Sequence, residues 1–335
     1  MQAKKILVIG SNSFTGSHFV SECINKGHKV LGISRSTEPD PMFLPYKWLN
    51  NSATKNQFKF KKVDINHDLG MLDTLLGEFM PEVVVNFAAQ GMVAQSWENP
   101  SDWYQTNVVG QVQLHERLRK EQYLEKYVHI TTPEVYGSTG EGWTKENFNF
   151  NPSTPYAVSR AACDLHLKTF FETYQFPVVY TRAANVYGPG QQLYRIIPRA
   201  ILTALTGSKM DLHGGGNSIR SFIHVSDVVR ATLKLALEAQ PGTSWHISTN
   251  RCISIKSLVK TIFKLAGANY SDNINIAPDR KGKDQQYLLD SSALREIHGW
   301  EDIVELESGL KETISWVKEH LDEMKILDWN YRHKQ

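Results

Sequence analysis

The stretch KKILVIGSNSFTG, residues 4–16, places four apolar residues directly before a loop of glycine and serine. Residues 6–9 predict a buried strand, and residues 17–26 predict the helix that follows the loop. A tight turn between such a strand and helix lets backbone N–H groups and the helix N-terminus meet a pyrophosphate. The loop therefore predicts a dinucleotide site. Its predicted cofactor contacts are Gly10, Ser13, Phe14, Thr15 and Gly16.

The same strand-then-helix pattern continues through the first half of the chain. Further apolar runs, separated by amphipathic stretches, lie at residues 29–33, 58–63, 83–87, 127–130 and 177–181. Strands that alternate with helices imply right-handed crossovers, so we predict an α/β fold with a Rossmann-type, doubly wound parallel sheet. After Arg182 the pattern becomes irregular and rich in glycine and proline. We predict a dinucleotide-binding domain over residues 1–182, with returns near 221–250, and a smaller C-terminal substrate-binding lobe over residues 183–335.

Composition excludes several other classes of protein. The 335 residues are 41% hydrophobic and 21% charged with a net charge of +2, which favours neither nucleic acid nor a membrane as main partner. The three cysteines are far apart and form no ligand motif, so we expect free thiols and no metal in a reducing, cytoplasmic setting. No leader-like segment precedes the first strand, and no apolar run reaches the ~18 residues of a membrane span.

The end of the second predicted strand indicates which dinucleotide binds. An acidic residue there would hold the adenosine ribose diol, but the sequence has Arg35 between Ser34 and Ser36. A guanidinium pairs well with a 2′-phosphate, so we predict NADP(H), with NAD(H) as the alternative. Further cofactor contacts are predicted after the third and fourth strands, at Asp64, Ile65, Phe87, Ala88, Ala89 and Gln90.

Tyr156 and Arg160 lie four residues apart, which places them on one face of a helix. The positive charge favours the phenolate, so we expect this tyrosine to act as a base closer to neutral pH than its ordinary pKa of ~10 allows. Such a base can take the proton of a sugar hydroxyl while a hydride leaves the same carbon.

Seven motifs, in this order and spacing, resemble those of one known family. They are NFAAQ (86–90), YQTN (104–107), TTPEVYG (131–137), PYAVSR (155–160), RAANVYGP (182–189), IRSFIHVSD (219–227) and DRKGKD (279–284). Over nearly its whole length the chain resembles the extended short-chain dehydrogenases/reductases, and within them the nucleotide-sugar 4,6-dehydratases that act on dTDP-glucose or GDP-mannose.

The resemblance implies an internal redox cycle on a nucleotide-diphosphate sugar. Tyr156 would take the C4 hydroxyl proton as hydride passes to the nicotinamide, with Thr132 bonded to the C4 oxygen. The new ketone acidifies C5–H, Glu134 removes that proton, water leaves from C6, and the hydride returns there. Arg160 would replace the lysine of the family, and Asn107 would support the cofactor site. The expected substrate contacts are Gln90, Ser96, Asn185, Arg195, Arg220 and Arg280.

Four departures from the family pattern keep other functions open. Arg160 stands for lysine, Pro133 stands where many dehydratases have an aspartic acid, and Ser13 and Gly91 replace a glycine and a serine. A uronate decarboxylase, a dehydratase that releases an unsaturated sugar, or a 4-oxidase would share the C4 ketone. Glu134 disfavours a 4-epimerase, and a non-catalytic NAD(P)-binding scaffold remains the alternative outside enzymes.

Residues 104–120 and 156–174 carry apolar stripes at helical spacing. In the family this helix pair often forms a four-helix interface, so the resemblance implies a homodimer. The sequence names neither the nucleotide base nor the sugar.

Overall fold

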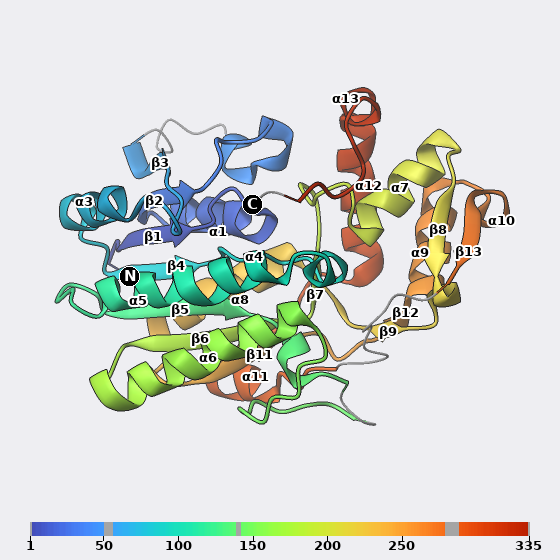
Figure 1. Cartoon of the computed structure of the whole chain (residues 1–335). Helices are drawn as coiled ribbons and strands as arrows, with labels where there is room; N and C mark the ends of the chain where they lie inside the picture. Colours follow the sequence, from blue (N-terminus) through green and yellow to red (C-terminus); the bar gives the residue numbers. More distant parts are fainter. Residues whose placement is uncertain (1, 50–55, 139–141, 279–287, 334–335) are drawn as a thin grey trace.

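The computed structural model describes residues 2–49, 56–138, 142–278 and 288–333, and within them a seven-stranded parallel sheet forms the centre (Figure 1). In spatial order the strands are β11 (Ser244–Ile247), β6 (Val178–Ala183), β5 (Lys126–Thr131), β4 (Val83–Asn86), β1 (Lys5–Ile9), β2 (Lys29–Ser34) and β3 (Phe58–Lys62). The chain order reverses between β1 and β4, which confirms the doubly wound Rossmann-type fold. β11 joins the sheet from the region where a return was predicted.

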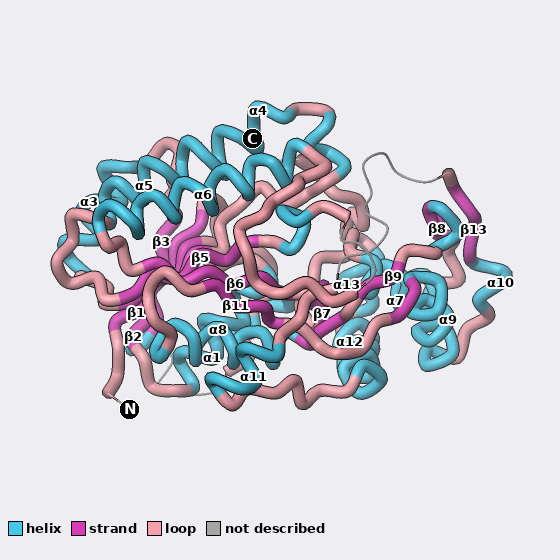
Figure 2. The backbone as a smooth tube through the Cα atoms, turned by 90° about the horizontal axis from the view of Figure 1, so that it is seen from below, coloured by secondary structure: helices cyan, strands magenta, loops and turns pink. Residues whose placement is uncertain are grey.

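Helices cover both faces of this sheet (Figure 2). Successive residues of β1 point to opposite sides: Leu7 and Ile9 belong to one core cluster, and Ile6 and Val8 belong to another. The first cluster includes α3 (Leu69–Phe79), α5 (Gly110–Leu118) and α6 (Pro155–Tyr174). The second includes α1 (Phe14–Asn25) and α8 (Val225–Glu238), while α11 (Ser292–His298) packs beside β11. Burial on both faces explains why strands such as β1 and β4 are apolar runs, whereas the edge strand β3 alternates between half-buried and exposed residues.

A smaller lobe with a core of its own lies beyond β6. It contains α7 (Ile196–Thr206), β8 (Met210–His213), α9 (Ile255–Ala266), α10 (Tyr270–Asn273), β13 (Ile274–Ala277), α12 (Leu306–Glu319) and α13 (Leu321–Lys325). Two short ladders connect it to the sheet half: β7 (Asn185–Tyr187) with β10 (Phe222–His224), and β9 (Ile219–Arg220) with β12 (Ile253–Ser254). The domain boundary at residue 182 stays a prediction. Within the described part of the chain, none of the helices combines the length and apolar character that a bilayer crossing needs.

The helix expected over residues 104–120 is interrupted. The structure has α4 (Pro100–Tyr104), a π-helical turn over Gln105–Val109, and then α5. The wider turn accommodates Asn107, whose fully buried side chain bonds both backbone groups of Gln90. Turns of this kind are frequent at functional sites. Apolar spacing alone could not reveal the interruption, because both halves keep the same buried stripe.

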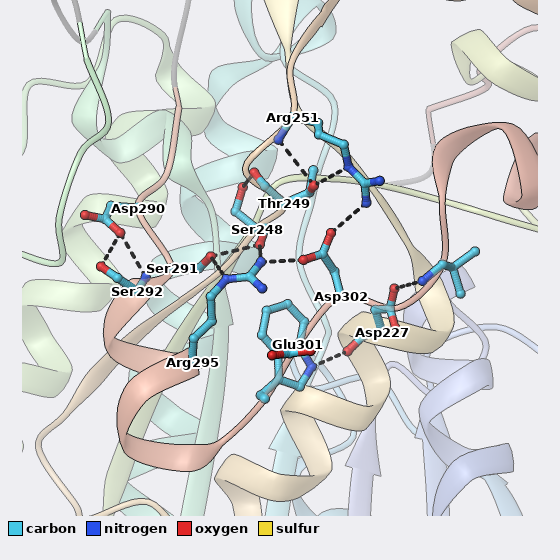
Figure 3. A network of polar contacts seen from close by, with 12 residues as sticks. Asp227, Ser248, Thr249, Arg251, Asp290, Ser291, Ser292, Arg295, Glu301 and Asp302 are labelled. Atoms are coloured by element: carbon cyan, nitrogen blue, oxygen red, sulfur yellow. Dashed lines mark hydrogen bonds and ion pairs between the residues drawn. The ribbon is translucent and has the colours of Figure 1, made fainter.

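A polar network joins the carboxyl end of β11 to the small lobe (Figure 3). Asp302 accepts hydrogen bonds from Arg295 and, at 2.9 Å, from Arg251. Asp227, fully buried at the start of α8, accepts the backbone N–H of Val304 at 3.1 Å. Asp227 thus holds the loop before α12 against α8, and Asp302 holds the same loop against α11 and the segment after β11.

A buried carboxylate attaches α6 to the sheet. Asp164 is fully buried, and its Oδ2 accepts from Arg182 Nη2 on β6 at 2.7 Å and from Thr131 Oγ1 on β5 at 3.0 Å. Its Oδ1 lies 3.2 Å from His129 Nε2. Burial alone would raise the pKa of Asp164, but the charge of Arg182 and the hydrogen bond from His129 hold it below its ordinary value. The Arg182 guanidinium also lies over three rings, those of Tyr136, Phe148 and Phe150.

We expect Asp164→Ala to lower the free energy of unfolding by about 3–5 kcal/mol, because it leaves the Arg182 charge buried without its carboxylate. The control is Asp73→Ala, which removes a carboxylate that is 53% exposed and 2.9 Å from Arg117. That change should cost about 0–1 kcal/mol. Urea denaturation measures both variants. Equal losses would show that Asp164 does not anchor α6.

Candidate active site

The glycine loop between β1 and α1 is packed too tightly for side chains at two positions. Gly10 has φ +81°, and a Cβ there would lie 2.9 Å from the backbone nitrogen of Ala88. A Cβ at Gly16 would lie 2.3 Å from the carbonyl oxygen of Gly10. Ser13 caps α1, because its hydroxyl accepts the backbone N–H of Gly16 at 3.1 Å. The helix therefore begins at Phe14, three residues earlier than the apolar pattern predicts.

This loop borders a cavity of about 540 Å³ at the carboxyl ends of the central strands. Eleven of the predicted cofactor residues line it: Gly10, Ser13, Ser34, Arg35, Ser36, Asp64, Ile65, Phe87, Ala88, Ala89 and Gln90. Phe14, Thr15 and Gly16 do not line the cavity, and their contact with a cofactor stays a prediction. Asn107 does not line the cavity, but it hydrogen-bonds both backbone groups of Gln90, which does. Ligands of open α/β sheets bind at such an edge, where the strand order reverses.

Several residues of the cavity were not identified from the sequence. Asn12 donates its backbone N–H to Ser34 Oγ at 3.0 Å and its side-chain amide to the Ser36 carbonyl at 3.2 Å, so it ties the glycine loop to the end of β2. The position of Asn12 inside the glycine loop is the sequence feature that could have identified it. Further additions come from the small lobe and the C-terminal end: Gln192, Leu193, Tyr194, Leu327, Asp328, Asn330 and Arg332. Phe43 reaches the cavity from the segment between β2 and β3.

A second group of predicted residues gathers where β5 ends and α6 begins. The 3-10 turn Pro133–Tyr136 follows β5, with Thr132 as its cap, and Tyr156 occupies the first turn of α6. Pro133 is the first residue of that turn, where its fixed φ is favourable. The Thr132 side chain hydrogen-bonds the Tyr156 phenol, and the charge of Glu134 acts on it. The structure thus brings three of the four predicted catalytic groups together, and the fourth is Arg160.

The pKa of Tyr156 is shifted in the direction opposite to our expectation. Burial raises it above the ordinary value, and the negative charge of Glu134 raises it further. Arg160 lowers this pKa as expected, as do the hydrogen bond from Thr132 and the charge of Arg195, but burial outweighs them in the protein alone. Spacing along the sequence reveals that Arg160 is near Tyr156, but it does not reveal that the Tyr156 phenol is buried. The predicted direction of the pKa shift of Tyr156 was therefore wrong.

Arg160 is itself only 2% exposed. Its Nη2 donates to the carbonyl of Ile130 and lies 3.5 Å from His129 Nε2, while Nε and Nη1 have no hydrogen-bond partner among the described residues. Burial lowers the pKa of His129 to about 4, so this imidazole is neutral at physiological pH. The two unused donors fit the hydroxyls of a nicotinamide ribose, and the tight glycine loop fits a pyrophosphate.

Three buried groups behind Arg160 lie as close together as metal ligands do. The ligand atoms of His115, His129 and Cys163 are all within 4.8 Å of one another. Burial raises the pKa of Cys163 to about 12, so it is a thiol, and the charge of Arg160 would oppose a cation there. His115 bonds the phenol of Tyr127 at 2.8 Å, which makes the cluster part of a polar core.

The predicted substrate residues are more scattered. Arg220 is 8% exposed and donates to the Ile219 carbonyl at 2.8 Å, and Asn185 donates to the Ser221 carbonyl at 3.2 Å. Arg195 is exposed at the start of α7. Ser96 is fully buried and donates to the Val93 carbonyl at 2.7 Å, so it stabilises its own turn, and its contact with a substrate stays a prediction. Arg280 lies outside the described residues.

Comparison with known proteins gives consistent matches over nearly the whole chain. Residues 7–313 match the family model described as GDP-mannose 4,6 dehydratase. The dTDP-glucose 4,6-dehydratase of Neisseria meningitidis serogroup B is 31% identical, with 98% of each chain covered. A crystal structure of dTDP-glucose 4,6-dehydratase from Bacillus anthracis, in complex with NAD, has a TM-score of 0.85 and 30% identity over 96% of this chain and 98% of that chain. A crystal structure of UDP-glucose 4-epimerase from Thermotoga maritima, with UDP-glucose, has a TM-score of 0.85 and 29% identity over 95% of this chain and 99% of that chain.

Proposed function

The chain belongs to the nucleotide-sugar 4,6-dehydratase family of extended short-chain dehydrogenases/reductases, and we propose that Tyr156, Thr132 and Glu134 carry out the reaction of that family on a nucleoside-diphosphate hexose. The observation that carries this proposal is that Glu134, in the turn after β5, lies near enough to the Tyr156 phenol for its negative charge to raise the pKa of that phenol. The Tyr156 phenol serves oxidation at C4, and the Glu134 carboxylate serves proton transfer at C5.

The roles of the side chains follow from their chemistry. A bound nicotinamide supplies the acceptor and later the donor of one hydride. Tyr156 takes the C4 hydroxyl proton, and the Thr132 hydroxyl donates to the resulting oxygen. The C4 ketone acidifies C5–H, and Glu134 takes that proton. As the C6–O bond breaks, the same proton passes from Glu134 to the departing oxygen, since Pro133 has none to give. Hydride then adds at C6, and C5 takes up a proton from solvent in exchange for the one that Tyr156 releases to solvent.

The shared fold does not separate this reaction from 4-epimerisation, because a dehydratase and an epimerase resemble the chain equally well. Glu134 separates them on chemical grounds. A carboxylate next to the catalytic phenol can remove the acidified C5 proton, a step that epimerisation at C4 does not need. A uronate decarboxylase would require a cation at the C6 carboxylate, and Arg195, whose charge acts on Tyr156, is the candidate for it.

For the cofactor we propose NADP(H), although the related crystal structure from Bacillus anthracis contains NAD. Arg35 lines the cavity together with Ser34 and Ser36. Glu38, the first acidic residue after β2, accepts hydrogen bonds from Tyr46 at 2.9 Å and from Lys47 at 3.2 Å. It is therefore engaged away from an adenosine ribose, and the cation remains the group suited to a 2′-phosphate.

We also propose that the chain forms a homodimer through α4, α5 and α6. Large apolar side chains remain exposed on these helices and on the turn between α4 and α5, namely those of Tyr104, Val109, Val158 and Leu165. A second copy of the same helices would cover them by two-fold symmetry.

The proposed reaction predicts that the protein removes one water from a nucleoside-diphosphate hexose. Incubation with a panel of dTDP-, GDP-, UDP- and CDP-linked hexoses and hexuronic acids, followed by mass spectrometry, measures this directly. Loss of water from one hexose is the expected outcome. Loss of carbon dioxide from a hexuronate would replace the proposal with decarboxylation, and unchanged sugars throughout would favour a scaffold.

Charge changes around Tyr156 should move the pH dependence of C4 oxidation in opposite directions. The phenolate is the active form, so the rate rises with pH through the pKa of Tyr156. Arg160→Met removes a charge that lowers this pKa and should move the rise to higher pH. Glu134→Gln removes a charge that raises it and should move the rise to lower pH.

Formation of the reduced nicotinamide, followed by absorbance over a range of pH, reports this step even where dehydration is blocked. Lys234→Ala, which removes a cation on α8 paired with Glu238 at 3.0 Å, is the control and should change nothing. Shifts of the same sign in both active-site variants would disprove the assignment.

The cofactor proposal predicts that NADP(H) binds more tightly than NAD(H) and that Arg35→Ala removes the difference. Loss of a charged hydrogen bond should weaken NADP(H) by about tenfold or more and leave NAD(H) nearly unchanged. Calorimetric titration of wild type and variant with both cofactors measures this. Tighter NAD(H) binding by the wild-type protein would overturn the preference.

A further inference from the structure

The end of the chain crosses from the small lobe to the sheet half. Residues 327–333, here named the C-terminal strap, follow α13 and end beside α4 (Figures 1 and 2). From residue 328 onward, exposed and half-buried residues alternate, as in an extended segment lying on a surface. The half-buried residues are Trp329, Tyr331 and His333. The exposed ones are Asp328, Asn330 and Arg332.

The near end of the strap is fixed in the small lobe. Trp329 packs against the core of that lobe, and its Nε1 donates to the Met324 carbonyl at 2.7 Å. The Arg199 guanidinium lies 5.3 Å from the centre of the Trp329 ring, and its Nη1 donates to the Trp329 carbonyl at 3.1 Å. Because these contacts precede the crossing, the strap has a fixed point of departure.

The far end is fixed on α4. The His333 ring stacks on the buried Trp103 ring, with centres 4.9 Å apart and planes 10° from parallel. His333 Nε2 lies 2.7 Å from Asp102 Oδ2. Between the two ends, Tyr331 meets the ring of Tyr194 edge-on at 5.3 Å. The strap is thus attached at both ends to different parts of the molecule.

The exposed face of the strap borders the dinucleotide cavity. Asp328, Asn330 and Arg332 line the same cavity as the glycine loop and Arg35. Asp328 organises this face, because it accepts the Asn330 backbone N–H at 2.9 Å and Arg332 Nε at 2.6 Å. The charge of Arg35 also acts on the phenol of the strap residue Tyr331. Amide and guanidinium groups at this edge are suited to a phosphate-bearing ligand.

We propose that the C-terminal strap is a component of the dinucleotide-binding site. The strap closes over the bound cofactor and slows the release of that cofactor. The chemistry supplies a reason: the hydride taken at C4 must return at C6, so a cofactor that left in between would strand an oxidised sugar. That reason rests on the proposed dehydration, whereas the binding role rests on the contacts of the strap alone.

The test is the dissociation rate of reduced cofactor, measured by nicotinamide fluorescence when the loaded protein is mixed with excess oxidised cofactor. Deletion of residues 331–335 removes the far attachment and keeps Trp329 in its core. We expect the rate to increase by about tenfold or more, since the hydrogen bond between His333 and Asp102 and the ring stack on Trp103 are both lost. Deletion of residues 334–335 alone is the matched control and should leave the rate at the wild-type value.

Single substitutions test the attachment without shortening the chain. Asp102→Ala and His333→Ala should each speed dissociation. The double variant should be no faster than the faster single variant, because both substitutions remove the same contact between Asp102 and His333. An unchanged rate in the deletion of residues 331–335, or equal rates in the two deletions, would overturn the proposal. The measurement uses no sugar, so its outcome is independent of whether dehydration is observed.

Discussion

The position of α6 depends on one buried carboxylate. Asp164 bonds Arg182 on β6 and Thr131 on β5, and all the charge it carries is removed from water. Such a group stabilises only the arrangement that satisfies it, since a displaced helix would leave Arg182 buried and unpaired. Tyr156 and Arg160 lie on the same helix, in the two turns before Asp164. The anchor therefore determines where the phenol meets Thr132 and Glu134, and where Arg160 places its two unused donors.

The sheet could be predicted from the sequence because strands buried on both faces must be continuous apolar runs, and residues 6–9 are the clearest of them. The glycine loop could be predicted because Gly10 and Gly16 admit no side chain. Other features depend on contacts between distant segments. The π-helical turn accommodates the buried side chain of Asn107, and the burial of Ser96 depends on how its turn packs. The net pKa shift of Tyr156 reflects the removal of its phenol from water. Spacing along the chain reports none of these.

Some features of this protein are shared with related enzymes, and others are particular to this chain. The fold is common to a dehydratase and a 4-epimerase, so the fold alone does not decide which reaction this chain carries out. Glu134, in the turn that begins at Pro133, is the residue on which the proposed dehydration depends. The C-terminal strap adds a contribution from the other end of the chain. Residues 327–333 carry no motif, so only the three-dimensional structure reveals their place beside the cavity.

The transfer of hydride within one sugar molecule tests the central claim most directly. A nucleoside-diphosphate hexose deuterated at C4 would be mixed with undeuterated substrate marked by heavy carbon, and the products analysed by mass spectrometry and NMR. The account predicts deuterium at C6 of the product, confined to molecules without heavy carbon. Deuterium that is absent from C6, or shared between the two populations, would contradict it.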